Sequence, residues 1–360
     1  MSRPKESLKT NTMRRAAFRP ILGGLAAGMI FASLPVLAGA AQAQTKKQPK
    51  AQTVAEQTAS EEKPNILFIM GDDIGFMQPK IYHRGLMVGE TPNIDRIGQE
   101  GAIFMDYVAM QSCTSGRNAF FTGMYPLRTG LIPPQLPGSP SYLRPGTPAV
   151  AKFLHDLGYT TGEFGKNHLG DHTEALPTAH GFQEYWGYLY HLDALQQVSF
   201  PDINKTPTEQ GIAPPCKNTP IPGLAEVPGA VDPKTTTCLT PPRPVLWCHS
   251  SDGTEKNQKC KDEGPLTLDR SRTVDEEISA KVIDFLDRND PKKTGKPFFV
   301  WYNPARMHVV TMLSPKYEAV VGTKGGKDWG TNAGMKQMDD NIGSVLDKLE
   351  EMGQLAARRT

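Results

Sequence analysis

The chain has 360 residues, of which 38% are hydrophobic and 22% are charged, so it contains enough apolar material for a globular protein of one large domain or two. This composition excludes a disordered or collagen-like chain. The formal charge is only +2, and no Lys/Arg stripe is interleaved with aromatic residues, so nucleic acid is not expected as a partner.

The first 43 residues have the features of an export signal. Arg14, Arg15 and Arg19 precede an apolar run over residues 21–40, and small residues up to Ala43 suit a signal peptidase. A retained membrane anchor is the alternative, but glycines and a proline interrupt the run. We therefore expect residues 1–43 to be a cleaved signal peptide, no stable membrane anchor, and a periplasmic or secreted protein.

Residues 44–62 are polar, lack apolar periodicity and predict a flexible linker, so the folded domain is expected over residues 63–360. Its first element is an apolar run of strand length at residues 65–70, which ends at Asp72 and Asp73. Adjacent carboxylates after a buried strand lie where open α/β sheets bind their ligands.

Helical and strand patterns alternate in the next segments. Thr91 is expected to cap a helix that starts at Pro92 and has Ile94 and Ile97 on its apolar face. Residues 102–108 then predict a strand. A helix after Thr147 and Pro148 and a strand over residues 159–164 repeat the alternation, with the following apolar stripe on the helix: Val150, Phe153, Leu154 and Leu157. The pattern predicts an α/β fold whose mostly parallel central sheet carries helices on both faces.

Residues from about 199 to 265 are dense in Pro, Thr, Lys and Gly and predict a long insertion beside the site. Four cysteines lie in it: Cys216, Cys238, Cys248 and Cys260. In an oxidising compartment they can form two disulfides in three possible pairings. A zinc site is the alternative, but no pair has the two-residue spacing typical of zinc ligands.

Regular patterns resume at Thr273, whose spacing to Glu276 predicts a capping box for a helix. Residues 298–302 predict a buried strand. The helix after Thr273 is expected to direct Ile278, Val282 and Phe285 inward. A last helix, ending at Gly353, is expected to have the following residues on its buried face: Met335, Met338, Ile342, Val345, Leu349 and Met352.

The segment that carries most chemical information is residues 112–123, which read SCTSGRNAFFTG. If a helix starts near Thr114, Cys113 and Arg117 approach one another at its N-terminal end, where free N–H groups and the helix dipole suit an anion. By itself this spacing is equally typical of a structural cysteine and a surface arginine.

Five blocks in order give the segment its meaning: NILFIMGDDIG, TPNIDRI, CTSGR with FFTG and PLRTGL, FGKNHLGD, and NPARMH. In order and approximate spacing they resemble the sulfatase family, in particular the bacterial arylsulfatases of the alkaline-phosphatase-like superfamily. The resemblance covers residues 63–353. It implies an enzyme that hydrolyses sulfate esters, with aryl sulfates as the expected substrates.

The resemblance implies a role for each matching residue. Cys113 matches the cysteine that a formylglycine-generating or equivalent maturation enzyme oxidises, and the hydrated aldehyde is the nucleophile. Arg117 matches the residue that positions it. Asp72 and Asp73 match carboxylate ligands of a calcium ion, with Mg²⁺ as the alternative, and the modified Cys113 side chain completes this part of the metal site.

Three further positions match catalytic residues of the family. Lys166 and His168 match a lysine on the sulfate and a histidine near the nucleophile, and His308 matches a histidine near the leaving-group oxygen. Taken singly, His168 is more typical of a loop histidine, His308 could be a core residue near a strand end, and Lys166 an ordinary surface lysine. All three are nevertheless expected at the carboxyl rim of one parallel sheet. The remaining histidines with no apparent catalytic partner are expected to be structural: His155, His180 and His191.

Two departures from the family pattern bear on activity. Ser115 and Gly116 stand where the maturation signature commonly has Pro or Ala and then Ser, although conversion of Cys113 is still expected. After Gly353 the family continues into a strand ending in an Asp-Asn pair of metal ligands and then a second lysine, whereas this sequence ends at Thr360. The C-terminal part is therefore expected to be missing, and this form to be weakly active or inactive.

Two other functions remain open at this stage. A phosphatase or phosphodiesterase of the same superfamily shares the carboxylate rim, although Cys113 in place of Ser or Thr argues against it. A non-catalytic remnant is the other. The sequence contains no signal for a particular sulfate ester.

Overall fold

The computed structural model describes residues 63–87, 89–132, 139–192, 243–308, 312–323 and 333–355. The predicted signal peptide and linker lie outside the described residues, as do Cys216 and Cys238.

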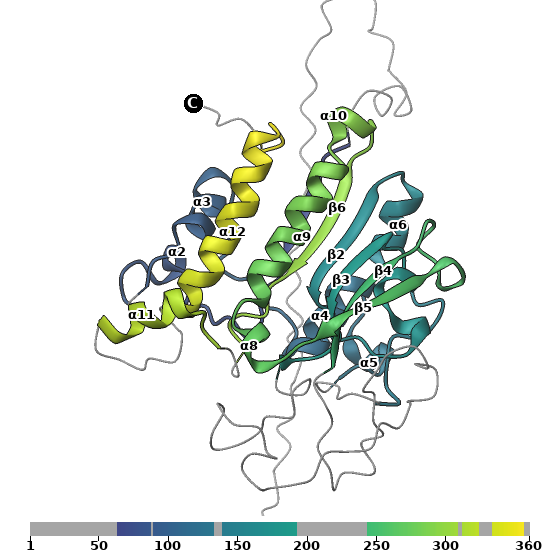
Figure 1. Ribbon diagram of the computed structural model, residues 1–360, viewed down its shortest axis with the longest axis horizontal. Coiled ribbons are helices and arrows are strands. Elements are labelled where there is room, and N and C mark those ends of the chain that lie inside the picture. The colour runs from purple at the N-terminus through teal and green to yellow at the C-terminus, as the bar shows by residue number, and fades with distance from the viewer. Residues whose placement is uncertain are drawn as a thin grey trace, which may run out of the picture. The chain divides into compact units, whose positions relative to one another are not determined.

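A six-stranded sheet organises the described residues, with the strand order β1-β6-β2-β3-β4-β5 (Figure 1). The strands are β1 (Ile66–Ile69), β2 (Thr160–Lys166), β3 (Glu184–Tyr188), β4 (Pro244–His249), β5 (Lys259–Pro265) and β6 (Phe298–Asn303). The first four in the sheet order pair in parallel, and β4 and β5 add an antiparallel edge. This confirms the predicted mostly parallel α/β sheet.

Helices cover both faces of the sheet, as predicted (Figure 1). On one face α9 (Val274–Arg288) and α12 (Ala333–Glu351) bury their apolar stripes against the strands. On the other, α4 (Cys113–Thr122) stacks Phe121 on Trp301 of β6, and α6 (Val150–Asp156) contributes Ala151 to the same core. Each fully buried aromatic or branched side chain contributes about 1.5–3 kcal/mol of transfer free energy.

The remaining helices are short or peripheral. They are α2 (Lys80–His83), α3 (Pro92–Glu100), α5 (Pro126–Thr129), α8 (Leu268–Ser271), α10 (Pro291–Thr294) and α11 (Pro315–Thr323), with 3₁₀ turns η1 (Thr173–Ala175), η2 (Pro177–Ala179) and η4 (Glu255–Asn257).

Both predicted helix caps differ in the structure. Thr91 makes no capping hydrogen bond; instead the carboxylate of Asp339 on α12 accepts from the backbone N–H groups of Asn93 and Ile94, at 3.0 and 2.8 Å. The capping box of Thr273 is likewise not formed. At α3 a tertiary contact with α12 thus replaces the local cap, whereas at α9 the Glu276 carboxylate accepts from the Gln337 amide of α12.

Two apolar stripes are narrower than their sequence patterns predicted. Ile97 of α3 is 45% exposed, and Phe153 and Leu157 at α6 are 59% and 56% exposed. Helix α6 also begins at Val150, after the predicted start at Thr147 and Pro148. These helices lie at the margin of the core, so only part of each stripe reaches the sheet.

The prediction of a strand over residues 102–108 is wrong. The segment is irregular and exposes large apolar side chains, including Tyr107 at 77% and Val108 at 88%. Strand β1 ends the sheet order on this side, so the segment has no strand partner among the described residues.

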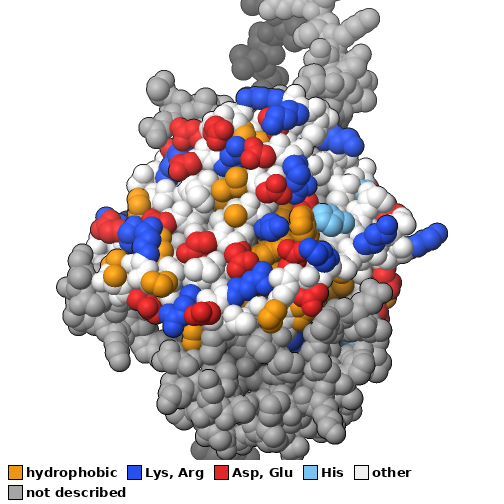
Figure 2. Space-filling view, in the orientation of Figure 1, with side chains coloured by type: hydrophobic (Ala, Val, Ile, Leu, Met, Phe, Trp, Pro, Cys, Tyr) orange, Lys and Arg blue, Asp and Glu red, His pale blue; other side chains and the backbone are white. Residues whose placement is uncertain are grey.

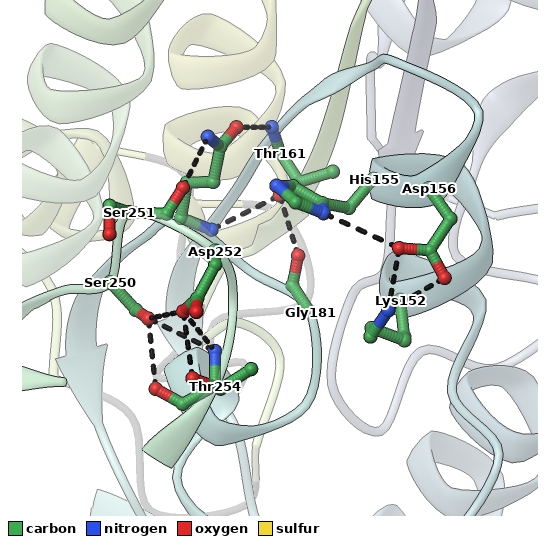
Figure 3. Close-up of polar contacts among 10 residues, drawn as sticks. Lys152, His155, Asp156, Thr161, Gly181, Ser250, Ser251, Asp252 and Thr254 are labelled. Atoms are coloured by element: carbon green, nitrogen blue, oxygen red, sulfur yellow. Dashed lines mark hydrogen bonds and ion pairs between the residues drawn. The ribbon is translucent and has the colours of Figure 1, made fainter. Parts of the chain in front are cut away.

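Residues 244–265, assigned to the insertion from the sequence, instead form β4 and β5 of the sheet. A disulfide joins Cys248 to Cys260 across the two strands, which selects one pair from the alternatives and removes both thiols from any zinc site. The turn between the strands is held by Asp252, whose carboxylate accepts from the Thr254 hydroxyl at 2.7 Å (Figure 3). Next to this turn, the Thr161 hydroxyl donates to the Gly181 carbonyl at 2.7 Å and anchors the start of β2 (Figure 3).

Candidate active site

The carboxyl ends of β1, β2 and β6 lie together at one edge of the sheet, which we call the rim. The Asp72 backbone, just after β1, is tied to the loop after β6: its N–H donates to the Arg306 carbonyl at 2.9 Å, and its carbonyl accepts from the Met307 N–H at 2.5 Å. Lys166 is the last residue of β2. The parallel strands therefore bring residues more than ninety positions apart into one site.

A buried ion cluster forms the centre of this rim. The Lys166 ammonium contacts Oδ2 of Asp72, and the Arg117 guanidinium lies 3.3 Å from Oδ1. Arg117 also donates to the Lys166 carbonyl at 2.8 Å. Burial by itself raises the pKa of Asp72, but the Lys166 ammonium and then the Arg117 guanidinium outweigh it and hold that pKa well below its ordinary value.

The close approach of β2 and β6 places Lys166 in the buried ion cluster. Gly165 has a φ of 110°, and a Cβ atom there would lie 1.9 Å from the Asn303 carbonyl oxygen of β6. Only glycine allows this backbone and this contact, so the strand can turn Lys166 inward at the rim.

Cys113 is the first residue of α4, one position earlier than predicted. Its thiol is free and partly exposed. It lines a cavity of about 950 Å³ together with Asp72, Asp73 and Arg117. The sulfur therefore opens to the same cavity as the two carboxylates, at a helix N-terminus whose dipole favours negative charge.

Three histidine rings lie in a row at the rim, and the sequence predicted only two of them. His308 Nε2 lies 3.9 Å from the carboxylate of Asp73. Its ring stacks on His191 with centroids 5.3 Å apart, and His191 lies 5.4 Å from the ring of His168. His191 stands three positions after the end of β3 and His168 two positions after the end of β2, so the position of His191 after a parallel strand was the available signal.

Three of the four non-glycine residues with positive φ among the described residues lie at this rim. They are Asp73 at 54°, Ser112 at 65° and His168 at 64°. Left-handed backbone costs an L-residue about 1–2 kcal/mol and tends to collect at functional sites. The strain therefore marks the same rim as the side-chain chemistry.

Two buried groups support the rim, and sequence reasoning missed both. Glu163 of β2 accepts hydrogen bonds from the side-chain amides of Asn167 and Asn303, at 3.0 and 3.3 Å. Burial raises its pKa to about 8, against the smaller lowering by those two amides and by Arg117. The alternation of residues along a strand does not show that a glutamate in it is buried in this environment.

The second group is an ion pair below the loop that carries His308. Arg306 donates to Asp275 of α9 at 2.6 Å and to the Met312 carbonyl at 2.8 Å, and both charged side chains are fully buried. The pair fixes the chain on both sides of His308.

The described residues do not complete a metal site. Among them, no group of three or more His, Cys, Asp or Glu side chains could hold a metal ion. Asp72 and Asp73 offer carboxylate oxygens, but both oxygens of Asp72 already face Lys166 or Arg117. Calcium takes about six to eight oxygen ligands, so these two residues alone do not fit a calcium site.

A parallel sheet whose rim joins a buried cation pair, two carboxylates, a free thiol and strained backbone is an arrangement typical of enzyme sites that bind anions. The sequence comparison specifies the family. The Sulfatase family model matches residues 64–357, and the chain belongs to this family.

Curated relatives include arylsulfatases. Arylsulfatase G of Homo sapiens is 26% identical over 307 residues, covering 80% of this chain and 49% of that protein. Arylsulfatase A of Bos taurus is 27% identical over 311 residues, covering 82% and 50%. The chain thus spans about half the length of the curated relatives it matches.

Solved structures support the same fold. The PsFucS1 sulfatase from Pseudoalteromonas sp. superimposes with a TM-score of 0.63 at 24% identity, covering 82% of this chain and 53% of that one. Ps i-CgsB, solved in complex with k-i-k-neocarrahexaose, gives a TM-score of 0.57 at 25% identity, covering 81% and 56%. The fold is that of the sulfatases.

The surface gives little further indication of the class of protein. On the face in Figure 2, basic and acidic side chains are interspersed over the described residues. Within the described part of the chain, no helix has the length and apolar character needed to cross a membrane.

Proposed function

We propose that this chain is the nucleophile-bearing part of a sulfate ester hydrolase acting on aryl sulfates, with a formylglycine derived from Cys113. The observation that carries the proposal is the shared cavity, in which Cys113, Arg117 and the two carboxylates of Asp72 and Asp73 face one space. Membership of the sulfatase family supports the reaction class.

The modified Cys113 would supply a hydrated aldehyde as the nucleophile, and the other residues divide the remaining tasks. Arg117 orients that side chain from the next turn of α4 and offsets its charge. Lys166 binds a sulfate oxygen. His168 lies on the nucleophile side, and His308, beside Asp73, transfers a proton to the leaving-group oxygen.

Calcium is the metal we propose for Asp72 and Asp73, with Mg²⁺ as the alternative, but these residues supply too few oxygens to hold it alone.

Mass spectrometry of the tryptic peptide ending at Arg117 tests the nucleophile. After co-production with a maturation enzyme, loss of sulfur and gain of oxygen at Cys113 is the expected result. An intact thiol under conditions that convert a known substrate of that enzyme would refute the proposal. A sulfatase should hydrolyse an aryl sulfate faster than the matching aryl phosphate, and the Cys113→Ala variant should lose this activity. A phosphatase would show the opposite preference.

We further propose that residues 1–43 direct export to the periplasm or the medium, that residues 44–62 act as a linker, and that residues 63–360 form the enzyme domain with an insertion starting at about 199. The pattern of basic, apolar and small residues supports the first assignment. N-terminal sequencing of the exported protein tests it, with Gln44 as the expected first residue.

A further inference from the structure

A small cavity lies between α5 and the loop of residues 142–148, with a volume of about 320 Å³. Arg128 and Arg144 both line it, and we call it the arginine pocket. We propose that this pocket binds a second sulfate group of a substrate that carries more than one. The identity of the substrate rests on the proposed function, whereas binding of the anion does not.

Arg144 is held in place before any ligand binds. Its guanidinium carbon lies 3.9 Å from the centre of the Tyr142 ring, and its Nη2 donates to the Pro140 carbonyl at 2.8 Å. An arginine has five N–H donors, so these contacts leave most of them available. An ordered side chain loses less entropy on binding than a freely rotating one, which favours a ligand at this position.

The Tyr142 ring that supports Arg144 is itself fixed. It stacks on the His172 ring with centroids 3.9 Å apart and an angle of 18° between the planes. Its hydroxyl donates to the Glu174 carboxylate at 2.9 Å. A turn holds the backbone as well, because the Thr147 N–H and hydroxyl both donate to the Arg144 carbonyl, at 3.1 and 2.6 Å. The loop is therefore built to present one guanidinium group.

The charge of the arginine pocket is not compensated. Both of its arginines are exposed, and among the described residues neither forms an ion pair. Glu174 interacts electrostatically with Arg144, and the formal charges of Arg128, Arg144 and Glu174 leave a net charge of +1. By contrast, Arg96 and Arg288 each pair with two carboxylates. The pocket therefore attracts an anion.

The pocket is attached to the segments that form the candidate active site. The Leu143 N–H donates to the carbonyl of Leu169, the residue after His168, at 2.8 Å. Met124 lines both the arginine pocket and the larger cavity that contains Cys113. A substrate with its ester group in the larger cavity would thus place another group across Met124 in the arginine pocket.

The chemistry of the two guanidinium groups suits a sulfate group. Each offers a planar fork of N–H donors that matches a pair of oxyanion oxygens. A sulfate ester has no proton to donate at neutral pH, so it needs donors only. A phosphate group would meet the same donors, and the experiment below therefore compares the two anions.

Binding is tested on the full chain produced without a maturation enzyme, so that Cys113 keeps its thiol and no ester is hydrolysed. Nitrogen NMR of the arginine side chains follows a titration with inorganic sulfate, with chloride at equal ionic strength as reference. Sulfate is expected to shift the Arg128 and Arg144 signals saturably. Sucrose octasulfate, a probe with many sulfate groups, is expected to bind at least about tenfold more tightly in calorimetry.

Matched variants test the location. Arg128→Gln and Arg144→Gln each remove one charged donor and are expected to weaken binding of sucrose octasulfate by about tenfold. Tyr142→Leu leaves both arginines in place but removes the ring under Arg144, and is expected to weaken binding by a smaller factor. Arg84→Gln is the control, because this exposed arginine does not line the arginine pocket or the larger cavity. It should bind the probe as the wild type does.

Three results would overturn the proposal. Signals of Arg128 and Arg144 that do not respond to sulfate would show that the pocket binds no anion. Equal losses in Arg84→Gln and the two pocket variants would reduce the effect to general charge attraction. Inorganic phosphate that binds as tightly as sulfate at neutral pH would exclude a site selective for sulfate. A failure to form the aldehyde at Cys113 would leave all these measurements unchanged, so the two proposals fail separately.

Discussion

Replacing Glu163 by Gln should change how the stability of this domain depends on pH. Glu163 is fully buried, and burial raises its pKa from the ordinary 4.5 to about 8. Its Oε1 accepts from the amides of Asn167 and Asn303, while Oε2 has no hydrogen-bond partner. A glutamine keeps the acceptor and stays neutral at every pH, so it mimics the protonated acid.

The sign and size follow from proton linkage. Between pH 4.5 and about 8 the unfolded chain has released the Glu163 proton and the folded chain has kept it, so the stability that this group contributes falls as the pH rises. Each pH unit in that interval removes about 1.4 kcal/mol. Over the whole interval the loss is on the order of 5 kcal/mol for the wild type and close to zero for the glutamine variant.

Urea unfolding of both proteins at several pH values from 5 to 9 measures the difference. The free energy of unfolding of the wild type minus that of Glu163→Gln should decrease steadily and level off above the folded-state pKa. Glu255→Gln, which alters an exposed carboxylate in η4, serves as control and should follow the wild type. A difference that is constant across this range would refute the buried, protonated state of Glu163.

Three further changes test the support of the fold. Asp275→Asn leaves the buried Arg306 guanidinium without its counter-charge, and should lower the free energy of unfolding by about 3–5 kcal/mol in urea titrations. Replacing Cys248 and Cys260 by serine opens a loop with a sequence separation of 12, and calorimetry should show a loss of about 3 kcal/mol, with no further loss on adding a reductant. Asp339→Ala removes the acceptor at the start of α3 and should cost about 1–2 kcal/mol, seen as a lower urea midpoint.

Sequence reasoning located the site residues best where a buried strand ends in polar residues. Asp72 follows the apolar run of β1, which is long enough to be read directly, and Lys166 ends β2, which was predicted after a helix pattern. The helix that begins at Cys113 was placed within one residue of its observed start. These features are local, so the pattern along the chain determines them.

The features that were missed depend on contacts between distant segments. Asp339 caps α3 from 246 residues away, and no local motif at Thr91 reports it. His191 joins the row of histidines only because β3 lies beside β2 in the sheet. The segment 102–108 carries a strand pattern, but a pattern cannot form a strand without a neighbour that supplies hydrogen bonds.

The charge state of Glu163 connects the stability of the sheet to the chemistry of the rim. The buried part of the site contains Arg117, Lys166 and Asp72, and their formal charges leave one positive charge uncompensated. Ionised Glu163 of β2, which interacts electrostatically with Arg117, would cancel it, whereas protonated Glu163 preserves it. The raised pKa of Glu163 therefore keeps this part of the rim positively charged at neutral pH, which favours an anion. Burial of a carboxylic acid inside a strand, which destabilises the fold at high pH, thus keeps the rim suited to an anion at neutral pH.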